Sequence, residues 1–365
     1  MKLGYFTMPL HPKDRDYGAT LREDRAAILL AEELGFVEAY VGEHVTDICE
    51  TITSCLIFIA SLASATSRIR LGSATVNLPN AHPAAVAAQV AMVDTMLDGR
   101  FIFGISQGGL LSDAEMFGNL DNDRVEMFVE AIDHIIALWT GEPPYKRAGK
   151  YWTLGTERTL LRDIGQGVMV KPLQKPHPPI VVTVTAPFSK GVVSAASRGW
   201  DPISANFLQP NWVASHFPMY RQGCDSIGRK VEPANWRVAK SIFVADDEAT
   251  AKHYAKSAGG PYGHYFNNLH RKLVSSKRAE LFKHDRALPD DAVTLDYILD
   301  TLVIAGTVDS VVDQLLAFRE RTGAFGTLLY AGHDWADPAL ARRSMELMAT
   351  RVLPAVNRAI GESEL

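Results

Sequence analysis

The sequence predicts a (β/α)8 barrel of the TIM type, with insertions after strands four and seven. Eight short, buried-type apolar runs alternate with helical patterns along the 365 residues. No internal repeat, low-complexity segment or linker divides the chain, and 47% hydrophobic residues suffice for one large core. A doubly wound sheet is the structural rival because it shows the same alternation. We expect a single barrel domain over residues 1–365.

The strand and helix positions follow from apolar runs and helical periodicity. The expected strands are 3–8, 36–44, 69–77, 101–106, 180–185, 200–206, 236–245 and 326–332. The expected helices are 21–34, 52–65, 84–97, 123–139, 189–198, 212–227 and 338–359. Thr20 and Glu23 predict a capping box for the first helix, and Gly35 predicts its end.

Two segments interrupt the alternation and are predicted insertions. Residues 141–179 contain GEPPYKRAGKYW and KPLQKPHPP, which favour an inserted loop or hairpin. Residues 246–300 are expected to be mostly helical, and their SAGGPYGHYF stretch offers glycine hinges. Lids that exclude water from a site are often built this way, so this insertion is a candidate lid.

Composition excludes several function classes. The net charge of −5 leaves no basic stripe for nucleic acid. No apolar run approaches the roughly 20 residues that span a bilayer, and the N-terminus lacks a signal-peptide pattern. The three cysteines, Cys49, Cys55 and Cys224, match no zinc or redox motif. A soluble protein of the reducing cytoplasm is expected.

Polar residues collect where the predicted strands end, which is where barrels place their chemistry. The second strand ends in Glu43 and His44, an adjacent acid and histidine. The other strand ends carry Thr75, Asn77, Ser106, Gly108, Gly109, Thr185, Ser189, Ser204, Asn206, His333 and Asp334. Small hydroxyls and glycine pairs in such number predict a site for a large ligand with polar edges.

The common site motifs are absent. Glu43, His44, His333 and Asp334 could ligate a metal, but no HExxH or spaced Cys/His pattern supports this, and we expect no metal. No G-x-S-x-G elbow, G-x-G-x-x-G fingerprint or P-loop occurs either. A cofactor held by a barrel rim is therefore favoured.

Seven segments, in order, resemble the bacterial luciferase-like flavin monooxygenases over nearly the whole chain. They are the EH after strand two, LGSATVNLPNAHP, DGRFIFGISQG, FGNLDNDR, PPIVVTVTAPFSKG, AGTVDSVVDQL and GTLLYAG. FTMPLHP, GGLLSDAEMFG and RGWDPISANF are most similar to members named limonene monooxygenases. The resemblance implies reduced FMN as co-substrate, O2, an NAD(P)H:flavin reductase as partner, and a homodimer.

The resemblance also assigns residues around the flavin ring. His44 matches the catalytic histidine beside the flavin. Ala74 and Thr75 match a place where the family often has a non-proline cis peptide under the ring. Ser106 matches a position near the reactive edge of the flavin, where luciferase has a cysteine, so thiol chemistry is not needed here. Glu43 is expected to face away from the flavin, as an ordinary polar exit from the core.

Arg124, Thr185 and Ser189 match the residues that hold the flavin phosphate. A guanidinium forks onto phosphate oxygens, and hydroxyls add neutral donors. Two alternatives stay open, namely that Arg124 is an exposed first-turn residue and that Ser189 is a plain helix cap. Luciferase has an arginine at Gln107 and a glutamate at Val184, so FMN binding is expected to be modest, or another residue substitutes.

The family chemistry runs through a flavin hydroperoxide. The protonated hydroperoxide would epoxidise or hydroxylate a terpene. The deprotonated form would insert oxygen beside a cyclic ketone by the Baeyer–Villiger reaction. His44 could exchange the proton that decides between them. The candidate pocket for this small apolar substrate, if these residues are not ordinary core, is Phe6, Met8, Leu110, Leu111, Met116 and Phe207.

The predicted helices at 52–65 and 84–97 are apolar nearly all round, so a homodimer is expected to cover them. Two rival functions remain. One is a deazaflavin-dependent oxidoreductase of the same barrel superfamily, and the other is a non-catalytic flavin-binding protein.

Overall fold

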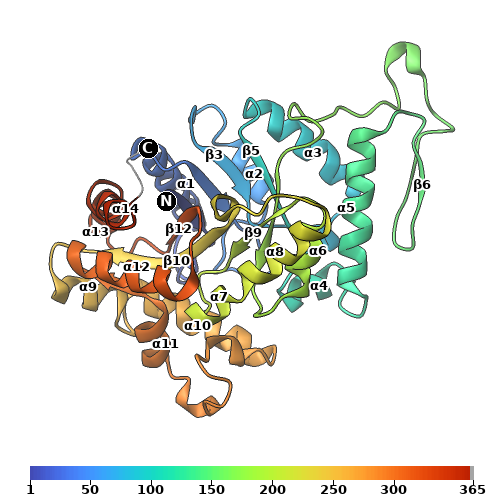
Figure 1. The fold of residues 1–365 in the computed structure, drawn as a ribbon. Helices are drawn as coiled ribbons and strands as arrows, with labels where there is room; N and C mark the ends of the chain where they lie inside the picture. The colour runs from blue at the N-terminus through green and yellow to red at the C-terminus, as the bar shows by residue number, and fades with distance from the viewer. Residues whose placement is uncertain (362–365) are drawn as a thin grey trace. The chain divides into compact units, whose positions relative to one another are not determined.

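The computed structural model describes residues 1–361, and its parallel strands have the order of a closed (β/α)8 barrel (Figure 1). Within these residues the ring order is β1 (Lys2–Thr7), β2 (Glu38–Val41), β3 (Arg70–Ser73), β5 (Phe101–Ser106), β8 (Ile180–Val184), β9 (Asp201–Ser204), β10 (Arg237–Val244) and β12 (Thr327–Gly332). Because β12 pairs with β1, the ring closes. The predicted barrel is confirmed, and the doubly wound rival is wrong.

The chain forms two compact units, which are described separately. The first unit contains Met1–Tyr40, Ile48–Thr51 and the chain from Val182 onward. The second unit contains Val41–Asp47 and Ile52–Val181. The expectation of one domain with insertions at 141–179 and 246–300 stays a prediction.

In the first unit, helix α1 (Tyr17–Glu33) starts earlier than predicted. Asp16 caps it by accepting the Ala19 N–H at 2.7 Å. Thr20 lies inside the helix, and its hydroxyl donates to the Tyr17 carbonyl. The predicted capping box is therefore wrong, because a carboxylate one turn earlier offers a better acceptor for the first free N–H groups.

The segment 246–300 is mostly helical, as expected, with α9 (Glu248–Ala255), α10 (Pro261–Ser275), η4 (Ala279–Phe282), η5 (Asp290–Ala292) and α11 (Leu295–Leu302). Gly259, Gly260, His264, Asn267 and Asp334 help line a cavity of about 500 Å³ in this unit. The mobility of this segment stays a prediction.

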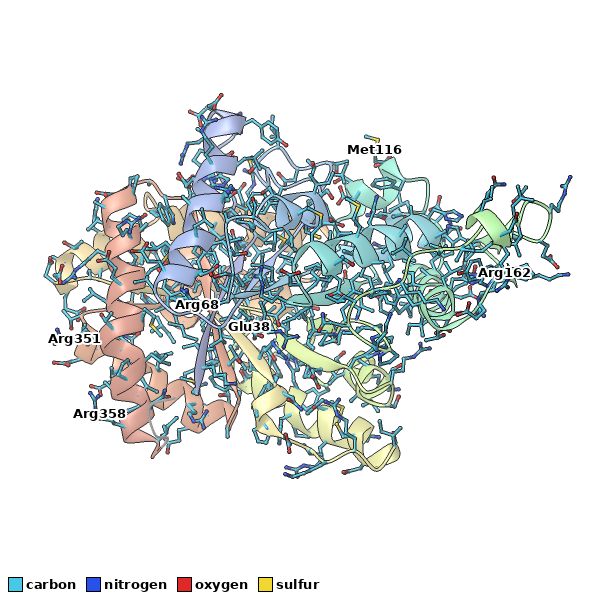
Figure 2. The ribbon with its side chains drawn as sticks, turned by 90° about the horizontal axis from the view of Figure 1, so that it is seen from above. Glu38, Arg68, Met116, Arg162, Arg351 and Arg358 are labelled. Carbon is cyan, nitrogen blue, oxygen red and sulfur yellow. The ribbon has the colours of Figure 1, made fainter. Side chains whose placement is uncertain are left out.

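The other helices of the first unit follow its strands. They are α6 (Lys190–Ala196), α7 (Pro210–Ala214), α8 (His216–Ser226), η3 (Pro233–Asn235), α12 (Val308–Thr322), α13 (Pro338–Leu347), η6 (Met348–Val352) and α14 (Leu353–Ala359). The short strand β11 (Ile304–Gly306) pairs with β10. The last predicted helix, 338–359, is continuous but contains the π-helical turn η6, and Figure 2 shows Arg351 and Arg358 along it.

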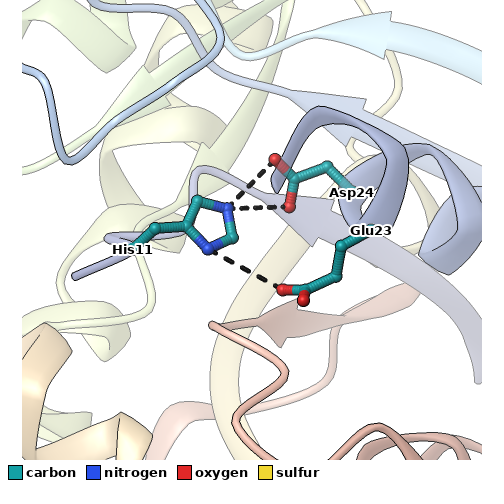
Figure 3. A group of neighbouring side chains, drawn as sticks. All are labelled: His11, Glu23 and Asp24. Carbon is teal, nitrogen blue, oxygen red and sulfur yellow. Dashed lines mark hydrogen bonds and ion pairs between the residues drawn. The ribbon is translucent and has the colours of Figure 1, made fainter. Parts of the chain in front are cut away.

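A buried ion cluster stabilises the start of the first unit (Figure 3). The two ring nitrogens of His11 contact Asp334 at 2.6 Å and Asp24 at 3.2 Å, and Glu23 lies 3.7 Å away. Arg15 pairs with both Glu23 and Asp334. Burial disfavours the charged imidazole, but the hydrogen bonds to the carboxylates outweigh it and raise the pKa of His11 to about 9. His11, Arg15 and the three carboxylates thus form one hydrogen-bonded ion network.

The second unit carries α2 (Cys55–Ala60), η1 (Leu78–Asn80), α3 (Pro83–Met96), α4 (Leu111–Met116), α5 (Arg124–Thr140) and η2 (Arg162–Ile164). Strand β4 (Val76–Asn77) pairs with β5. Helix α2 is shorter than the predicted 52–65. Ser54 caps its start, and the Ser61 hydroxyl bonds the Phe58 carbonyl at its end, in competition with the helix.

The predicted insertion at 141–179 contains the antiparallel hairpin of β6 (Lys146–Ala148) and β7 (Thr153–Gly155). In Figure 1 this hairpin stands out beyond α5 in the second unit. The hairpin reading of the sequence is thus correct for this part of the segment. Throughout residues 1–361, every helix is too short or too polar to cross a membrane.

Candidate functional site

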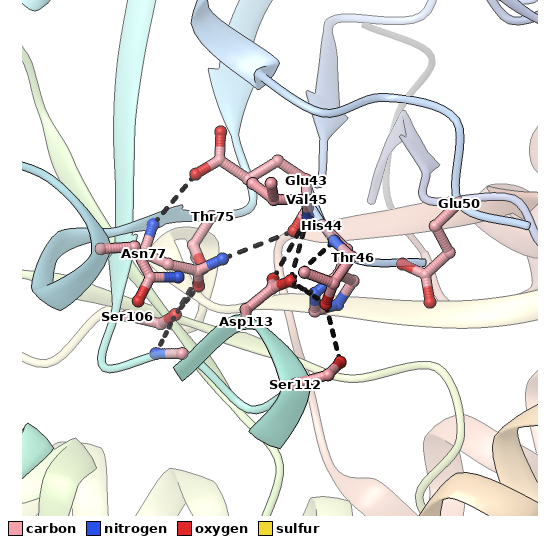
Figure 4. Close-up of polar contacts among 12 residues, drawn as sticks. Glu43, His44, Val45, Thr46, Glu50, Thr75, Asn77, Ser106, Ser112 and Asp113 are labelled. Atoms are coloured by element: carbon pink, nitrogen blue, oxygen red, sulfur yellow. Dashed lines mark hydrogen bonds and ion pairs between the residues drawn. The ribbon is translucent and has the colours of Figure 1, made fainter. Parts of the chain in front are cut away.

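His44 lies in the second unit, just beyond β2, and a carboxylate orients it (Figure 4). Its Nδ1 is 3.1 Å from Oδ2 of Asp113, a residue in the first turn of α4. Asp113 also accepts the Val45 N–H, the Thr46 N–H at 2.8 Å and the Thr46 hydroxyl at 2.5 Å. One buried carboxylate therefore fixes both the loop after β2 and the imidazole. Asp113 lies within GGLLSDAEMFG, but no local sequence pattern predicts its contact with His44.

The state of Asp113 determines the tautomer of His44. Burial disfavours its charge, but the hydrogen bonds from His44 and Thr46 more than compensate and lower the pKa of Asp113 to about 2. At neutral pH the carboxylate can only accept hydrogen bonds, so Nδ1 of His44 carries a hydrogen. The nitrogen left to gain or lose a proton is Nε2.

Glu43 holds two backbone segments together. It is therefore more than the ordinary polar exit from the core that the sequence predicts. One carboxylate oxygen accepts the Cys55 N–H at 2.9 Å, and the other accepts the Asn77 N–H at 3.2 Å. Burial raises the pKa of Glu43. Glu43 does not serve as the partner of the His44 ring, because Asp113 takes that place.

Thr75, Asn77 and Ser106, which the sequence places at strand ends, come together in the second unit. The Ala74–Thr75 bond is cis, as the resemblance implied. The Thr75 hydroxyl donates to Oγ of Ser106 at 2.7 Å, and Ser106 donates to Oδ1 of Asn77 at 2.8 Å. Ser106 also accepts the Gly108 N–H at 3.1 Å. These contacts hold the ends of β3, β4 and β5 in one hydroxyl network.

A glycine allows β3 and β5 to approach closely beneath this network. A Cβ on Gly104 would lie 1.7 Å from the Ser73 carbonyl oxygen, which no side chain can tolerate. The Ser73 hydroxyl bonds both the N–H and the carbonyl of Gly104. The hydroxyl network is thus positioned by the backbone of two strands as well as by side chains.

Arg124 begins α5, whose N-cap Asp123 accepts two backbone N–H groups. Its Nη1 donates to the carbonyl of Gly108 at 3.2 Å, and Gly108 has a left-handed φ of 79°. The side chain is half-buried at the first position of the helix, and its role at the phosphate stays a prediction. Among residues 1–361 no carboxylate lies within ion-pair distance of it. Arg124 thus places a positive charge without a carboxylate partner, among the described residues, near the turn that follows Ser106.

The other two predicted phosphate residues lie in the first unit, around the loop after β8. Thr185 accepts a hydrogen bond from Nη2 of Arg278 at 3.3 Å. Ser189 occupies the N-cap position of α6, but its hydroxyl makes no capping bond. The alternative of a plain cap therefore does not account for this side chain.

A buried chain of hydrogen bonds, unforeseen from the sequence, fixes the same loop. Nε1 of Trp236 donates to Ser204, the Ser204 hydroxyl is 2.8 Å from Nδ1 of His216, and Nε2 of His216 donates to the Ala186 carbonyl at 3.0 Å. Burial lowers the pKa of His216 to about 4, so the ring is neutral and this arrangement sets its tautomer. Ser204, at a predicted strand end, is thus a structural link.

Asn206 and His333, also at strand ends, belong to a second buried network in this unit. Asn206 donates to Ser241 and to the hydroxyl of Tyr265, and Nε2 of His333 contacts Ser241 at 3.0 Å. Burial lowers the pKa of His333 to about 3. Within residues 1–361, Nδ1 of His333 is buried without a hydrogen-bond partner.

The proposed substrate-pocket residues differ in exposure. In the second unit, Leu110 is half-buried, and Leu111 is 44% exposed. Met116 is 69% exposed and projects from the surface in Figure 2. In the first unit Met8 and Phe207 are half-buried, and Phe207 packs on the ring of Phe282. Their role in substrate binding stays a prediction.

Comparison with known proteins identifies relatives over nearly the whole chain. The profile of the family described as "Luciferase-like monooxygenase" matches residues 1–324. The 4-hydroxyprotoasukamycin monooxygenase of Streptomyces nodosus subsp. asukaensis is 31% identical over 98% of this chain and 92% of its own. Limonene 1,2-monooxygenase of Rhodococcus erythropolis is 28% identical over 98% of this chain and 87% of its own.

A solved structure extends the likeness to the fold. The oxygenating constituent of 3,6-diketocamphane monooxygenase from Pseudomonas putida, a type II Baeyer–Villiger monooxygenase in complex with FMN, has a TM-score of 0.87 at 25% identity. The match covers 97% of this chain and 98% of that one. The resemblance drawn from the seven sequence segments is therefore confirmed, and this chain is an enzyme of the luciferase-like monooxygenase family.

Proposed function

We propose that this chain is the oxygenase of a two-component monooxygenase, which uses reduced FMN and O2 to oxygenate a small apolar substrate such as a terpene or a cyclic ketone. The observation that carries the proposal is the His44–Asp113 pair, in one unit with the hydroxyl network of Thr75 and Ser106. The names of the relatives support the reaction class.

The residues of the second unit fit a flavin. Within residues 1–361, Arg124 is a half-buried guanidinium without a carboxylate partner, which suits a terminal phosphate. Thr75, Asn77 and Ser106 present hydroxyl and amide groups, which suit the polar edge of an isoalloxazine. The Cβ position of Gly109 meets no atom within 4 Å, so space is left beside the Ser106 turn. When bound, reduced FMN supplies the electrons that activate O2.

His44 is proposed to hold and move one proton at Nε2. Asp113 keeps the hydrogen on Nδ1, so the ring presents Nε2 in a constant orientation whether or not it is protonated. General acid–base help of this kind contributes roughly 10²- to 10⁴-fold to a rate. The half-buried position of His44 also limits water, which would otherwise divert the reaction toward hydrogen peroxide.

The proposal predicts oxygen uptake that depends on both reduced FMN and substrate. With a separate flavin reductase and NADH, a panel of terpenes and cyclic ketones should yield at least one oxygenated product, with one O2 consumed per product. Oxygen-electrode traces combined with mass spectrometry of products from ¹⁸O2 would measure this. Turnover without O2, supported by a reduced deazaflavin, would sink the proposal in favour of the oxidoreductase alternative. FMN-dependent O2 uptake that no member of the panel alters would contradict the proposed substrate class.

We also propose a homodimer formed through α2 and α3. Ile57 on α2 is 76% exposed, and Met92 and Met96 on α3 are 61% and 43% exposed. Together with the exposed Ala85 and Ala88, the two methionines form an apolar stripe along one face of α3. Such a surface is costly in water unless another subunit covers it. The enzyme is further proposed to be cytoplasmic, where a reductase can deliver reduced FMN.

A Met92→Glu, Met96→Glu double variant should be largely monomeric. Burying two carboxylates without partners costs several kcal/mol, so the dissociation constant should rise about 100-fold or more. Sedimentation velocity over a range of concentrations measures it. Val274→Glu, an exposed apolar residue changed in the same way on α10, is the control and should leave the dimer intact. A monomeric wild-type chain, or a double variant that still dimerises, would contradict the proposal.

A further inference from the structure

We propose that Arg278, from the segment 246–300, and Thr185, after β8, form a phosphate-binding pair that takes the monoester phosphate of FMN. The inference rests on the proposed use of FMN and adds a residue that the resemblance did not assign. It makes this segment part of cofactor recognition as well as a candidate lid. Both residues belong to the first unit.

The pair is joined by a direct hydrogen bond. Nη2 of Arg278 donates to Oγ1 of Thr185 at 3.3 Å. Because the threonine oxygen accepts this bond, its own hydrogen remains available to donate to a ligand. The other N–H groups of the guanidinium are also available, since no further hydrogen bond of this side chain is found within residues 1–361. Two kinds of donor therefore stand side by side at the end of a barrel strand.

The end of α10 fixes the backbone of Arg278. Lys277 adopts a left-handed φ of 57°, and its N–H bonds the Val274 carbonyl at 3.0 Å. The N–H of Arg278 bonds the Leu273 carbonyl at 2.7 Å. These two bonds form a Schellman motif, which ends a helix and defines the direction of the chain beyond it.

The backbone after Arg278 is also fixed, because its carbonyls accept hydrogen bonds from side chains of α7 and of the residue that precedes α7. Gln209 donates to the Phe282 carbonyl at 2.8 Å, Trp212 to the Lys283 carbonyl at 2.7 Å, and Asn211 to the His284 carbonyl at 2.9 Å. Arg278 thus lies between two fixed points. A pre-positioned cation binds an anion with less loss of conformational entropy than a mobile one.

The charge of Arg278 has no partner in the part of the chain that the structure describes. Two other cations of the same segment do, since Lys272 pairs with Glu50 and Lys283 with Asp290. No carboxylate within residues 1–361 lies at ion-pair distance from Arg278, although its side chain is half-buried. A phosphate monoester supplies two negative charges and three acceptor oxygens, which suit a guanidinium beside a hydroxyl.

Flavin titrations test the pair. Arg278→Ala should weaken FMN binding about 10- to 100-fold, the range expected for lost charge-assisted hydrogen bonds, and leave riboflavin binding within about twofold. Arg278→Lys should retain part of the FMN preference, Thr185→Val should lose part of it, and the exposed Arg271→Ala on α10 should change neither affinity. Unchanged riboflavin binding also shows that each variant is folded.

The outcomes separate this inference from the proposed function. A wild-type chain that binds neither flavin would overturn the proposed function. A wild-type chain that prefers FMN, with the full preference kept in Arg278→Ala, would overturn only the phosphate pair. Equal weakening of FMN and riboflavin by Arg278→Ala would overturn it too, because the residue would then support the segment without contacting phosphate.

Proteolysis gives a readout that needs no turnover. Lys277 is exposed and precedes Arg278, so trypsin should cut after it. FMN should protect this bond in the wild-type chain, riboflavin should not, and Thr185→Val should reduce the protection. Protection by inorganic phosphate but not by FMN would assign the pair to another phosphate and overturn its role in flavin binding.

Discussion

Asp113→Asn is expected to turn the enzyme into one that consumes O2 but releases most of it as hydrogen peroxide. Oδ1 of Asp113 accepts from Thr46, and an asparagine oxygen can keep that bond. The amide nitrogen then replaces Oδ2 and presents hydrogens to Nδ1 of His44, so the ring must take the other tautomer. In that tautomer Nε2 carries the hydrogen and has no lone pair to accept a proton. Oxygenation should therefore fall on the order of 100-fold.

The measurement is the ratio of product formed to O2 consumed, with a substrate that the wild-type chain oxygenates. FMN affinity should stay within about twofold, because Asp113 acts through His44 and the loop after β2. Glu115→Gln, the same chemical change at an exposed position of α4, is the matched control and should keep the ratio. His44→Ala should reproduce the uncoupling. An Asp113→Asn chain with an unchanged product ratio would refute the positioning role.

Arg124→Ala is expected to weaken FMN binding about 10- to 100-fold while riboflavin binding changes little. The guanidinium donates to Gly108 and has no carboxylate partner within residues 1–361, so its remaining donors are available for phosphate. Arg124→Lys should recover only part of the affinity, because an ammonium is a point charge without the planar fork.

Fluorescence quenching of each flavin by the chain measures both affinities. Arg158→Ala, an exposed arginine of the same unit, is the control and should alter neither. Equal losses for FMN and riboflavin would remove Arg124 from the phosphate site.

The fold could be read from the sequence because each strand and helix carries its own local pattern. Alternating apolar runs and helical periods sufficed to place the strands around the barrel. Errors arose where two local signals competed. Asp16 displaced Thr20 as the cap of α1, and Ser61 helped to end α2 well before residue 65. Such choices depend on free-energy differences of about 1 kcal/mol, which a pattern does not resolve.

The candidate site could be read only in part. His44, Thr75 and Ser106 stand at strand ends, so topology alone brings them to one edge of the barrel. Asp113 lies 69 residues from His44 in the sequence, and nothing local links the two. Its position in the first turn of a helix, after two glycines and two leucines, is a weak signal of an acceptor for nearby N–H groups. Arg278 is 93 residues from Thr185, in a segment whose sequence predicts a lid and gives no sign of a phosphate contact.

The division of the chain into two units has a consequence for its synthesis on the ribosome. Most of the second unit is one continuous stretch, Ile52–Val181, so its contacts can form soon after Val181 has emerged. Strand β1 is made before this stretch, whereas its neighbour β12, which begins at Thr327, is made after it. The unit that carries His44 and Arg124 can therefore fold early, while β1 keeps one edge unpaired and open to other chains until β12 is complete.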